Sequence, residues 1–458
     1  MEREVEKLAG ANIGGETRIG TVATASFIGT AIEAYDLYLY GFAAAFVLGP
    51  LFFPGFSETA QTLAAFATFA ASFLARPLGA ILFGHFGDRL GRKAMLVLSL
   101  LVMGFATFFI GLLPGFDTLG VAAPLLLVVL RFLQGVGFGG EWGGAVLMSA
   151  EHAPRGRRGF YASFPQLGPP VGFLFASGAF LVVTTTFSDA GFQTFGWRIP
   201  FLVSIVLVGI GLYVRIRIAE TPVFRRAMEE QSASRVPILE LVRRYPKELI
   251  LTTGTMVVLF GTFYIFSTFA PSYETTQLGL GTSTTLYITM TAVIFMGLTI
   301  PVSAAVSDRV GRRNLCLAAA ALFGLWSFPM FWLVDTGEPL LIILSFAVLM
   351  VIYGMMFGPV AAFFSEQFET RVRYSGISLG YNLGGIVGGA FTPIIATELF
   401  ASTGASWSIS LYIVALAAIS LLSVFLLSET YSKDLSDVEA GSRGPAKSDP
   451  ATDSPGSV

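Results

Sequence analysis

Two carboxylic acids lie inside the first long apolar run of the chain, where ionisable side chains are rare. Glu33 and Asp36 are three residues apart and Tyr40 follows four residues after Asp36, so the three side chains share one face of a helix. Burial and the proximity of two like charges both disfavour a pair of ionised carboxylates. We therefore predict that Glu33 and Asp36 take up and release a proton. The alternative is that they pair permanently with Arg76 or Arg131 and only hold helices together.

Arg131 is a basic group at a similar depth in the fourth apolar run, with Gln134 one helical turn beyond it and Glu141 ten residues beyond it. An arginine at that depth can hold a carboxylate through two parallel hydrogen bonds or set the protonation of a nearby acid. We predict that Arg131 binds an anionic substrate or acts in proton coupling together with Glu141. A static ion pair with Glu141 or Asp36 is the alternative.

Further polar side chains in apolar runs are predicted substrate contacts, with ordinary interhelical hydrogen bonds as an equally good interpretation. They are Tyr35, Tyr38, Gln134, Gln166, Tyr381 and Asn382.

A short basic motif occurs twice, each time between two apolar runs. It reads Gly84-His85-Phe86-Gly87-Asp88-Arg89-Leu90-Gly91-Arg92-Lys93 in the first copy and Ser307-Asp308-Arg309-Val310-Gly311-Arg312-Arg313 in the second, 220 residues later. A carboxylate at a helix end can accept hydrogen bonds from a neighbouring helix N-terminus and from arginines, which would close one face of the molecule. The predicted gating residues are Gly84, Asp88, Arg89, Gly91, Arg92, Asp308, Arg309 and Arg312. The alternative is that these charges only set the membrane topology.

The elements that position these groups are long apolar helices. The chain is 54% hydrophobic and 13% charged, whereas a soluble domain has about 25% charged residues. Twelve apolar runs are long enough to cross a bilayer, at 19–47, 60–83, 95–113, 122–145, 160–183, 197–214, 249–271, 284–306, 314–333, 339–361, 376–396 and 407–427. We predict an all-α membrane protein with twelve transmembrane helices in two pseudo-symmetric six-helix bundles, because the basic motif repeats at about half the chain length.

The distribution of positive charge predicts the orientation. All but Arg76, Arg131 and Arg198 of the 28 basic residues fall in segments that share one side of the membrane, and the loops on the other side carry acids, among them Glu274. Basic loops face the cytoplasm, so both termini are predicted to be cytoplasmic. The predicted organisation is a cytoplasmic tail 1–18, a bundle 19–214, a central cytoplasmic loop 215–248, a second bundle 249–427 and a disordered cytoplasmic tail 428–458.

Small and rigid residues predict local features of the helices. Glycines recur at four-residue spacing as Gly135, Gly139 and Gly143, and again as Gly380, Gly384 and Gly388, which favours close helix packing. Pro165, Pro169 and Pro170 predict a kink or break in the fifth apolar run.

The basic motif, the run Arg131-Phe132-Leu133-Gln134-Gly135 and the twelve-helix layout resemble the major facilitator superfamily. Five further segments resemble its metabolite:H⁺ symporter family: Ile32-Glu33-Ala34-Tyr35-Asp36, Arg76-Pro77-Leu78-Gly79, Gly139-Gly140-Glu141-Trp142-Gly143-Gly144, Glu220-Thr221-Pro222 and Arg371-Val372-Arg373-Tyr374-Ser375-Gly376. The resemblance implies alternating access and proton-coupled uptake of a small polar metabolite. The family's substrates are organic acids such as shikimate, α-ketoglutarate and citrate, or zwitterions such as proline and betaine. Ala34 stands where the family has Trp, which would reshape the pocket.

Other classes of protein find little support in the sequence. Cys316 is the single cysteine and there are two histidines, so neither a disulfide nor a histidine-rich metal site is predicted. We found no nucleotide-binding loop or nucleophile motif, so the chain is predicted to be neither an enzyme nor an ATP-driven pump, and to need no cofactor. The predicted partners are a small-molecule substrate, a proton and the lipid bilayer, without nucleic acid. We predict a monomer in the cell inner membrane.

The sequence leaves alternative functions open. They are a proton-driven exporter such as a drug:H⁺ antiporter and, more distantly, a membrane-embedded enzyme or sensor. The substrate, the direction and stoichiometry of transport, and coupling to H⁺ or to Na⁺ are open as well.

Overall fold

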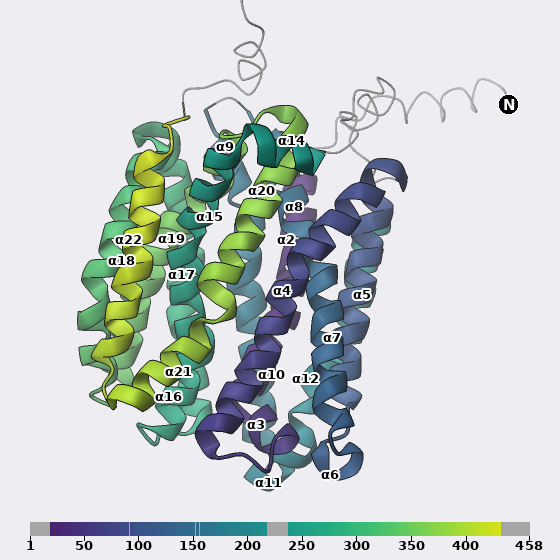
Figure 1. The fold of residues 1–458 in the computed structure, drawn as a ribbon, viewed down its shortest axis with the longest axis vertical. Helices are drawn as coiled ribbons and strands as arrows, with labels where there is room; N and C mark the ends of the chain where they lie inside the picture. The colour runs from purple at the N-terminus through teal and green to yellow at the C-terminus, as the bar shows by residue number, and fades with distance from the viewer. Residues whose placement is uncertain (1–18, 91, 152, 155, 218–236, 432–458) are drawn as a thin grey trace, which may run out of the picture.

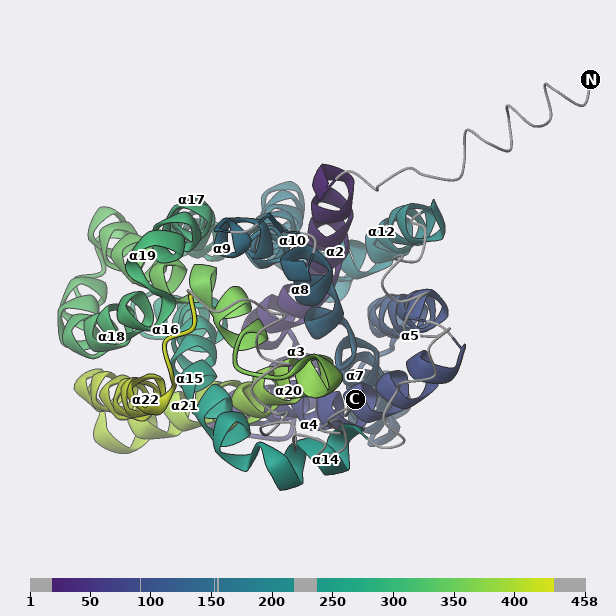
Figure 2. The same ribbon diagram turned by 90° about the horizontal axis from the view of Figure 1, so that it is seen from above.

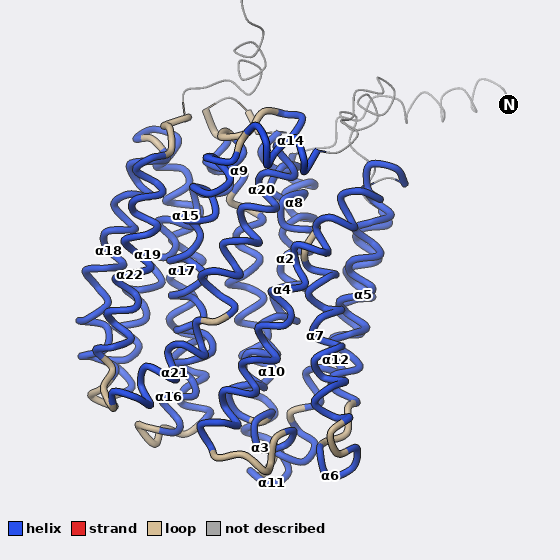
Figure 3. The backbone as a smooth tube through the Cα atoms, in the orientation of Figure 1, coloured by secondary structure: helices blue, strands red, loops and turns tan. Residues whose placement is uncertain are grey.

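The computed structural model describes residues 19–90, 92–151, 153–154, 156–217 and 237–431, and within these ranges the chain forms helices and no strand (Figure 3). An apolar chain in a bilayer must satisfy its backbone hydrogen bonds internally, and a helix does so within each segment. The predicted all-α membrane fold is confirmed.

The first half of the chain supplies six transmembrane segments. They are α2 (Ile19–Phe46), α4 (Glu58–Leu90), α5 (Arg92–Leu112), α7 (Ala122–Phe138) continued by α8 (Glu141–Glu151), α9 (Arg158–Ala162) continued by η1 (Pro165–Leu167) and α10 (Gly168–Thr186), and α12 (Arg198–Arg217). Short helices α3 (Leu48–Phe52), α6 (Phe116–Leu119), α11 (Asp189–Gly191) and η2 (Phe192–Gly196) connect them at one end.

The second half supplies six more. They are α15 (Pro246–Tyr264) continued by η3 (Ile265–Phe269) and α16 (Ala270–Thr276), α17 (Thr282–Val310), α18 (Arg312–Val334), α19 (Pro339–Ser365), α20 (Thr370–Gly385) continued by η4 (Ile386–Ala390) and α21 (Thr392–Thr403), and α22 (Trp407–Leu426). The additional helix α14 (Pro237–Arg244) precedes them.

Length and hydropathy alone identify most of these segments as membrane spans. In the described part of the chain nine helices are long and apolar enough to span a membrane, and the bent pair Asp189–Gly196 and Arg198–Val214 makes a tenth. The remaining two segments do not meet both criteria: Val97–Leu112 is apolar but shorter, and the 28-residue helix α2 is assigned as a span from its place in the bundle.

The helices run roughly parallel and form two groups (Figures 1 and 2). We call the end that carries α9 and α14 in Figure 1 the upper end, and the end that carries α3, α6 and α11 the lower end. Viewed from above, α17, α18, α19 and α22 lie on one side and α5, α7 and α12 on the other (Figure 2). The halves meet where α10 packs beside α17 and where α20 packs beside α4.

Glycines bring the helices of each half together, as the four-residue spacing predicts. A Cβ added to Gly135 would lie 2.0 Å from the Ser72 carbonyl oxygen on α4, and one added to Gly139 would lie 1.9 Å from the Arg76 carbonyl oxygen. In the second half a Cβ on Gly388 would lie 2.3 Å from the Val257 carbonyl oxygen on α15. The prediction of close helix packing at these glycines is confirmed.

The close contact between Gly139 and the Arg76 carbonyl oxygen gives a stability prediction. Replacing Gly139 with Ala forces α4 and α7 apart, and overpacking of this kind costs about 1–3 kcal/mol, so the Gly139→Ala protein should unfold at a lower temperature in detergent. Gly209 on α12 is a matched control, because nothing lies within 4 Å of its added Cβ. Thermal unfolding followed by tryptophan fluorescence measures both. Equal midpoints for the two variants would contradict the assigned packing.

Three regions differ in detail from the sequence expectations or refine them. The three prolines break the fifth segment into α9, η1 and α10, as predicted. Part of the expected loop 215–248 is helical: α12 extends to Arg217, α14 occupies Pro237–Arg244 and α15 begins at Pro246. Proline is suited to the first turn of a helix, so Pro246 can begin α15. Glu274 was expected in an exposed loop, which is wrong: it lies in α16 and is fully buried, because α16 packs against α17 and α2.

Candidate functional site

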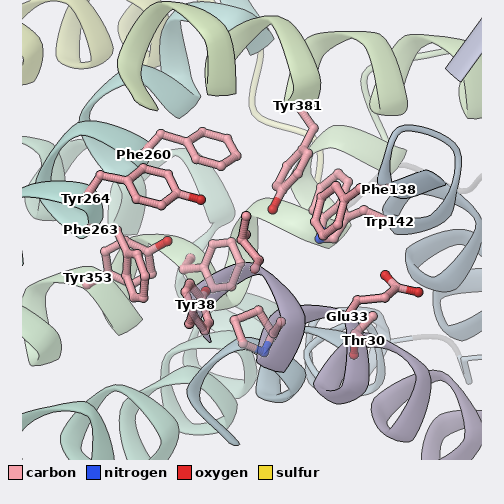
Figure 4. Close-up of a pocket in the computed structure, with 14 residues that line it drawn as sticks. Thr30, Glu33, Tyr38, Phe138, Trp142, Phe260, Phe263, Tyr264, Tyr353 and Tyr381 are labelled. Atoms are coloured by element: carbon pink, nitrogen blue, oxygen red, sulfur yellow. The ribbon is translucent and has the colours of Figure 1, made fainter. Parts of the chain in front are cut away.

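A cavity of about 30 Å³ lies between the two halves of the molecule (Figure 4). Nine of its fourteen lining residues are aromatic. The first half contributes Thr30, Glu33, Ala34, Leu37, Tyr38, Phe138, Trp142 and Pro169, and the second half contributes Phe260, Phe263, Tyr264, Tyr353, Phe357 and Tyr381. Glu33 and Thr30 lie at one side, and the hydroxyl-bearing rings of Tyr264, Tyr353 and Tyr381 lie opposite (Figure 4). This volume holds roughly two water molecules, so a metabolite requires these side chains to move.

Side chains from both halves close the cavity towards the upper end. The rings of Trp142 and Tyr381 stack with their centroids 3.9 Å apart. Trp142 Nε1 donates to Gln166 Oε1 at 2.9 Å, and Gln166 Nε2 donates to the Phe357 carbonyl oxygen at 3.0 Å. Asn382 Nδ2 donates to the Gly139 carbonyl oxygen at 3.0 Å. Gln166 and Asn382 therefore hold the two halves together just outside the cavity.

An aromatic layer between the halves closes the cavity towards the lower end. The ring of Phe263 lies 5.2 Å from that of Tyr38 and 6.0 Å from that of Phe173, and the rings of Phe69 and Tyr264 are 5.1 Å apart. Such edge and tilted contacts pack well but carry no hydrogen bonds across the halves. Side chains from both halves thus pack against one another on both sides of the cavity.

Asp36 is fully enclosed between helices, and neither carboxyl oxygen has a hydrogen-bond partner among the described residues. Thr107 on α5 is the polar group beside it. The Thr107 hydroxyl already donates to the Met103 carbonyl oxygen at 3.0 Å and accepts from Gln134 Nε2 at 2.7 Å. An ionised Asp36 would therefore find no donor there, whereas a protonated carboxyl can donate to the free lone pair of Thr107.

Arg131 is linked to Asp36 through Gln134 and Thr107. It donates to Gln134 Oε1, and its guanidinium lies 3.8 Å from the centroid of the Tyr40 ring. Tyr40 in turn hydrogen-bonds Thr68. Arg131, Gln134, Thr107 and Asp36 thus form a row that joins α7, α5 and α2. Sequence reasoning placed Arg131 and Asp36 but missed Thr107, since a single threonine inside an apolar run gives no signal of its own.

Arg76 on α4 is a second buried arginine in this region. Its side chain is fully buried, and its guanidinium lies between the rings of Phe73, at 3.7 Å, and Phe138, at 4.2 Å. No hydrogen bond or ion pair within the described part of the chain reaches its nitrogens. Cation–π contacts of this kind contribute about 2 kcal/mol when desolvated, which offsets only part of the cost of burying the charge.

The remaining predicted contacts differ in their distance from the cavity. Glu33, Tyr38 and Tyr381 line it. Tyr35 does not, because its hydroxyl donates to the Pro200 carbonyl oxygen at 2.9 Å and so faces α12. Glu141 is buried at the start of α8 and does not line the cavity; it accepts a hydrogen bond from the Ser99 hydroxyl on α5 at 3.5 Å.

The upper end is closed by a cluster that we call the Glu366 cluster: Glu366, Arg312, Asp308 and Arg158. Glu366 accepts from Arg312 Nε at 2.7 Å and Nη2 at 2.9 Å, and from Arg158 Nη1 at 3.0 Å. Asp308 pairs with Arg312 at 3.1 Å. Arg158 belongs to the first half and the other three to the second, so the cluster joins the two halves through buried charges.

Asp308 also contacts the backbone of the first half. Its two carboxyl oxygens accept from the backbone nitrogens of Gly159 at 2.9 Å and Phe160 at 3.1 Å, at the start of α9. Gly311 has φ +96°, a conformation open mainly to glycine, and it turns the chain so that Arg312 can begin α18. The contact expected of a carboxylate in the second motif copy is present in this structure.

Of the other predicted gating residues, the structure describes only part. Arg309 is exposed and has no role in the cluster. In the first copy, Gly91 lies outside the described residues, as do the side chains of Asp88, Arg89 and Arg92; Gly84 lies within α4.

Comparisons with known proteins agree with this architecture. The sequence profile of the Major Facilitator Superfamily matches residues 26–389. The chain is 42% identical over 421 residues to the inner membrane metabolite transport protein YhjE of Escherichia coli K12, covering 90% of this chain and 95% of that protein. It is 39% identical to the shikimate transporter of the same strain, again over 90% and 95% of the two chains. The proline/betaine transporter of E. coli K12 is 33% identical over 90% of this chain and 84% of that one.

Solved structures of related fold were also found. The proton:xylose symporter XylE, bound to 6-bromo-6-deoxy-D-glucose, superposes with a TM-score of 0.72 at 17% identity, covering 93% of this chain and 99% of that one. At this identity the likeness shows the fold alone.

Proposed function

The chain belongs to the major facilitator superfamily and is a multi-pass membrane transporter of small metabolites rather than an enzyme, and from that premise we propose how it couples transport to a proton. The observation that carries the proposal is the Asp36 carboxyl group, fully buried with no hydrogen-bond partner in the described chain. A carboxylate in such surroundings is costly, so Asp36 holds a proton in the occluded state and releases it when the site opens to water.

Arg131 takes part in this coupling through Gln134 and Thr107. When Asp36 loses its proton, the row can reorient so that the Thr107 hydroxyl donates to the carboxylate instead of to the Met103 carbonyl. The positive charge of Arg131 at the far end favours that change. Glu33, at the cavity wall, and Glu141, at the start of α8, are the further proton-coupling residues of this proposal.

Alternating access arises from rocking of two bundles, residues 19–214 and 249–427, about the cavity, with the central segment 215–248 joining them. The upper end faces the cytoplasm, since it carries the basic motif, and both tails, 1–18 and 428–458, lie on that side. The Glu366 cluster is the inner gate, and the aromatic layer is the outer one. The transporter acts as a monomer in the lipid bilayer of the bacterial inner membrane, without nucleic acid or a cofactor.

The substrate is a small organic acid or zwitterion, taken up with the proton. Support for this class comes from the relatives, one named as a shikimate transporter and another as a proline/betaine transporter. Tyr38 and Tyr381 contact it from the cavity wall, and Gln166 and Asn382 act on it through the closure of the upper end.

Reconstitution in liposomes tests the proposal. The protein is placed in vesicles that contain a pH-sensitive dye, and shikimate, α-ketoglutarate, citrate, proline and betaine are added in turn outside. We expect one of them to cause proton influx that empty vesicles do not show. Substrate-dependent proton efflux would instead indicate an exporter, and uptake that requires Na⁺ and ignores pH would contradict proton coupling.

A further inference from the structure

Arg76 is a buried cation that has no counter-charge among the described residues. Its side chain is fully buried, and Nε, Nη1 and Nη2 all lack an acceptor within the described residues. We propose that Arg76 binds a carboxylate group of the transported metabolite. This inference rests on the proposed function, and it narrows the substrates to metabolites that carry an ionised carboxylate.

The other buried arginines of the described chain, Arg131, Arg312 and Arg373, each donate at least one hydrogen bond, which makes Arg76 distinct. Arg312 is held by Glu366 and Asp308. Arg131 donates to Gln134. A guanidinium is planar and offers paired donors that match a carboxylate, so a buried arginine with only the Tyr264 hydroxyl beside it is suited to that ligand.

Arg76 lies immediately behind the cavity wall. The Phe138 ring that covers one face of the guanidinium is a lining residue of the cavity, and the Tyr264 hydroxyl, which points into the cavity, lies beside the guanidinium (Figure 4). Tyr38 and Tyr381, two further lining residues, are within range of the Arg76 charge. Phe138 and Tyr264 thus stand between Arg76 and the cavity, and their side chains must shift to expose Arg76 to a ligand.

The surroundings favour an anion over a neutral ligand. Arg76 and Arg131 are close enough to repel each other, and Asp36, with no ion pair, leaves neither arginine neutralised. A carboxylate entering this region would relieve the repulsion and supply the missing acceptors. The rings of Phe73 and Phe138 both contact the guanidinium, which restricts its movement and so favours a bidentate contact with a carboxylate.

A purely structural role is the competing explanation. In that case Arg76 would only clamp α4 to α7 through its stacking on Phe138, and its loss would lower stability without changing which ligands bind. The test therefore needs a measure of charge recognition that is separate from stability.

The experiment compares each acid of the liposome panel with its methyl ester, which keeps the shape and removes the negative charge. Ligand-induced thermal stabilisation of the purified protein gives the affinities, and liposome uptake gives transport. In the wild type we expect the transported acid to bind at least about 100-fold more tightly than its ester, because the ester leaves a buried charge unpaired. Arg76→Gln should remove that preference, so that acid and ester bind within about threefold of each other.

Arg76→Lys and Arg198→Gln complete the set. Lysine keeps the positive charge but lacks the paired donors of a guanidinium. The acid should therefore bind to Arg76→Lys about tenfold more weakly than to the wild type, while the preference for the acid over the ester remains. Arg198 also lies in a membrane helix but donates to the carbonyl oxygens of Gly111 and Leu113, so its loss should leave the preference intact. If Arg76→Gln does not fold, unchanged acid affinity in Arg76→Lys overturns the inference.

The outcomes separate the inference from the function on which it rests. Uptake of an acid by the wild type, with equal binding of acid and ester or with an unchanged preference in Arg76→Gln, overturns the role of Arg76 and leaves proton-coupled transport standing. If the wild type carries no member of the panel, the proposed function is contradicted, and the inference with it.

Discussion

Replacing Asp36 with Asn should abolish accumulation driven by a pH gradient while leaving exchange of substrate across the membrane intact. Asparagine keeps the size of the side chain but cannot release a proton, so movement of substrate is no longer tied to proton movement. With one proton per substrate, a gradient of one pH unit supports about tenfold accumulation, since one pH unit is worth about 1.4 kcal/mol. In Asp36→Asn vesicles the ratio of internal to external substrate should fall to about one.

Two assays in the same vesicles distinguish loss of coupling from loss of the protein. Gradient-driven uptake is measured with a labelled substrate, and counterflow is measured with no pH gradient and unlabelled substrate inside. Asp117→Asn is the matched control: Asp117 is an exposed acid at the lower end, so this variant should accumulate substrate as the wild type does. Undiminished accumulation in Asp36→Asn would remove Asp36 from the coupling mechanism.

Replacing Glu366 with Gln should open the upper end of the transporter. Glu366 accepts hydrogen bonds from Arg312 and Arg158 and from the Thr430 hydroxyl, at 2.8 Å in the last case. An uncharged amide removes the Glu366 carboxylate from both Arg312 and Arg158, and breaking a buried ion pair in this way costs about 3–5 kcal/mol. Only the closed upper end loses this energy, so the population of molecules open at that end should rise by about 100-fold or more.

The single cysteine makes the distance measurement simple. Cys316 is buried, and replacing it with Ser gives a background into which cysteines for spin labels can be introduced at the exposed positions Arg157 and Val310, one in each half near the cluster. Pulsed spectroscopy should then find a longer distance between the labels in Glu366→Gln than in its parent. Glu338→Gln, which alters an acid at the opposite end, should not change it. A distribution identical to that of the parent would show that the Glu366 cluster is not a gate.

The sequence by itself determined the class of the protein and the positions of its long apolar helices. Twelve apolar runs require helices in a bilayer, and the helices fall where the runs predict them, including the break at Pro165 and the close packing at Gly135 and Gly139. These features depend on hydropathy and on backbone geometry, which are local properties. Charges inside apolar runs are conspicuous for the same reason, and Glu33, Asp36 and Arg131 could be named before any contact was known.

Only the tertiary structure decided which of these charges have partners. Spacing along one helix places Asp36 and Glu33 on a common face, but it cannot show that Thr107 of another helix stands beside Asp36, or that Arg76 is left between two rings with no acceptor among the described residues. It also cannot show that Tyr35 turns towards Pro200 rather than the cavity, or that Glu274 is buried. Each of these outcomes depends on how helices far apart in the chain rotate and pack against one another. That arrangement follows from the sum of all side-chain contacts, which no single segment of sequence encodes.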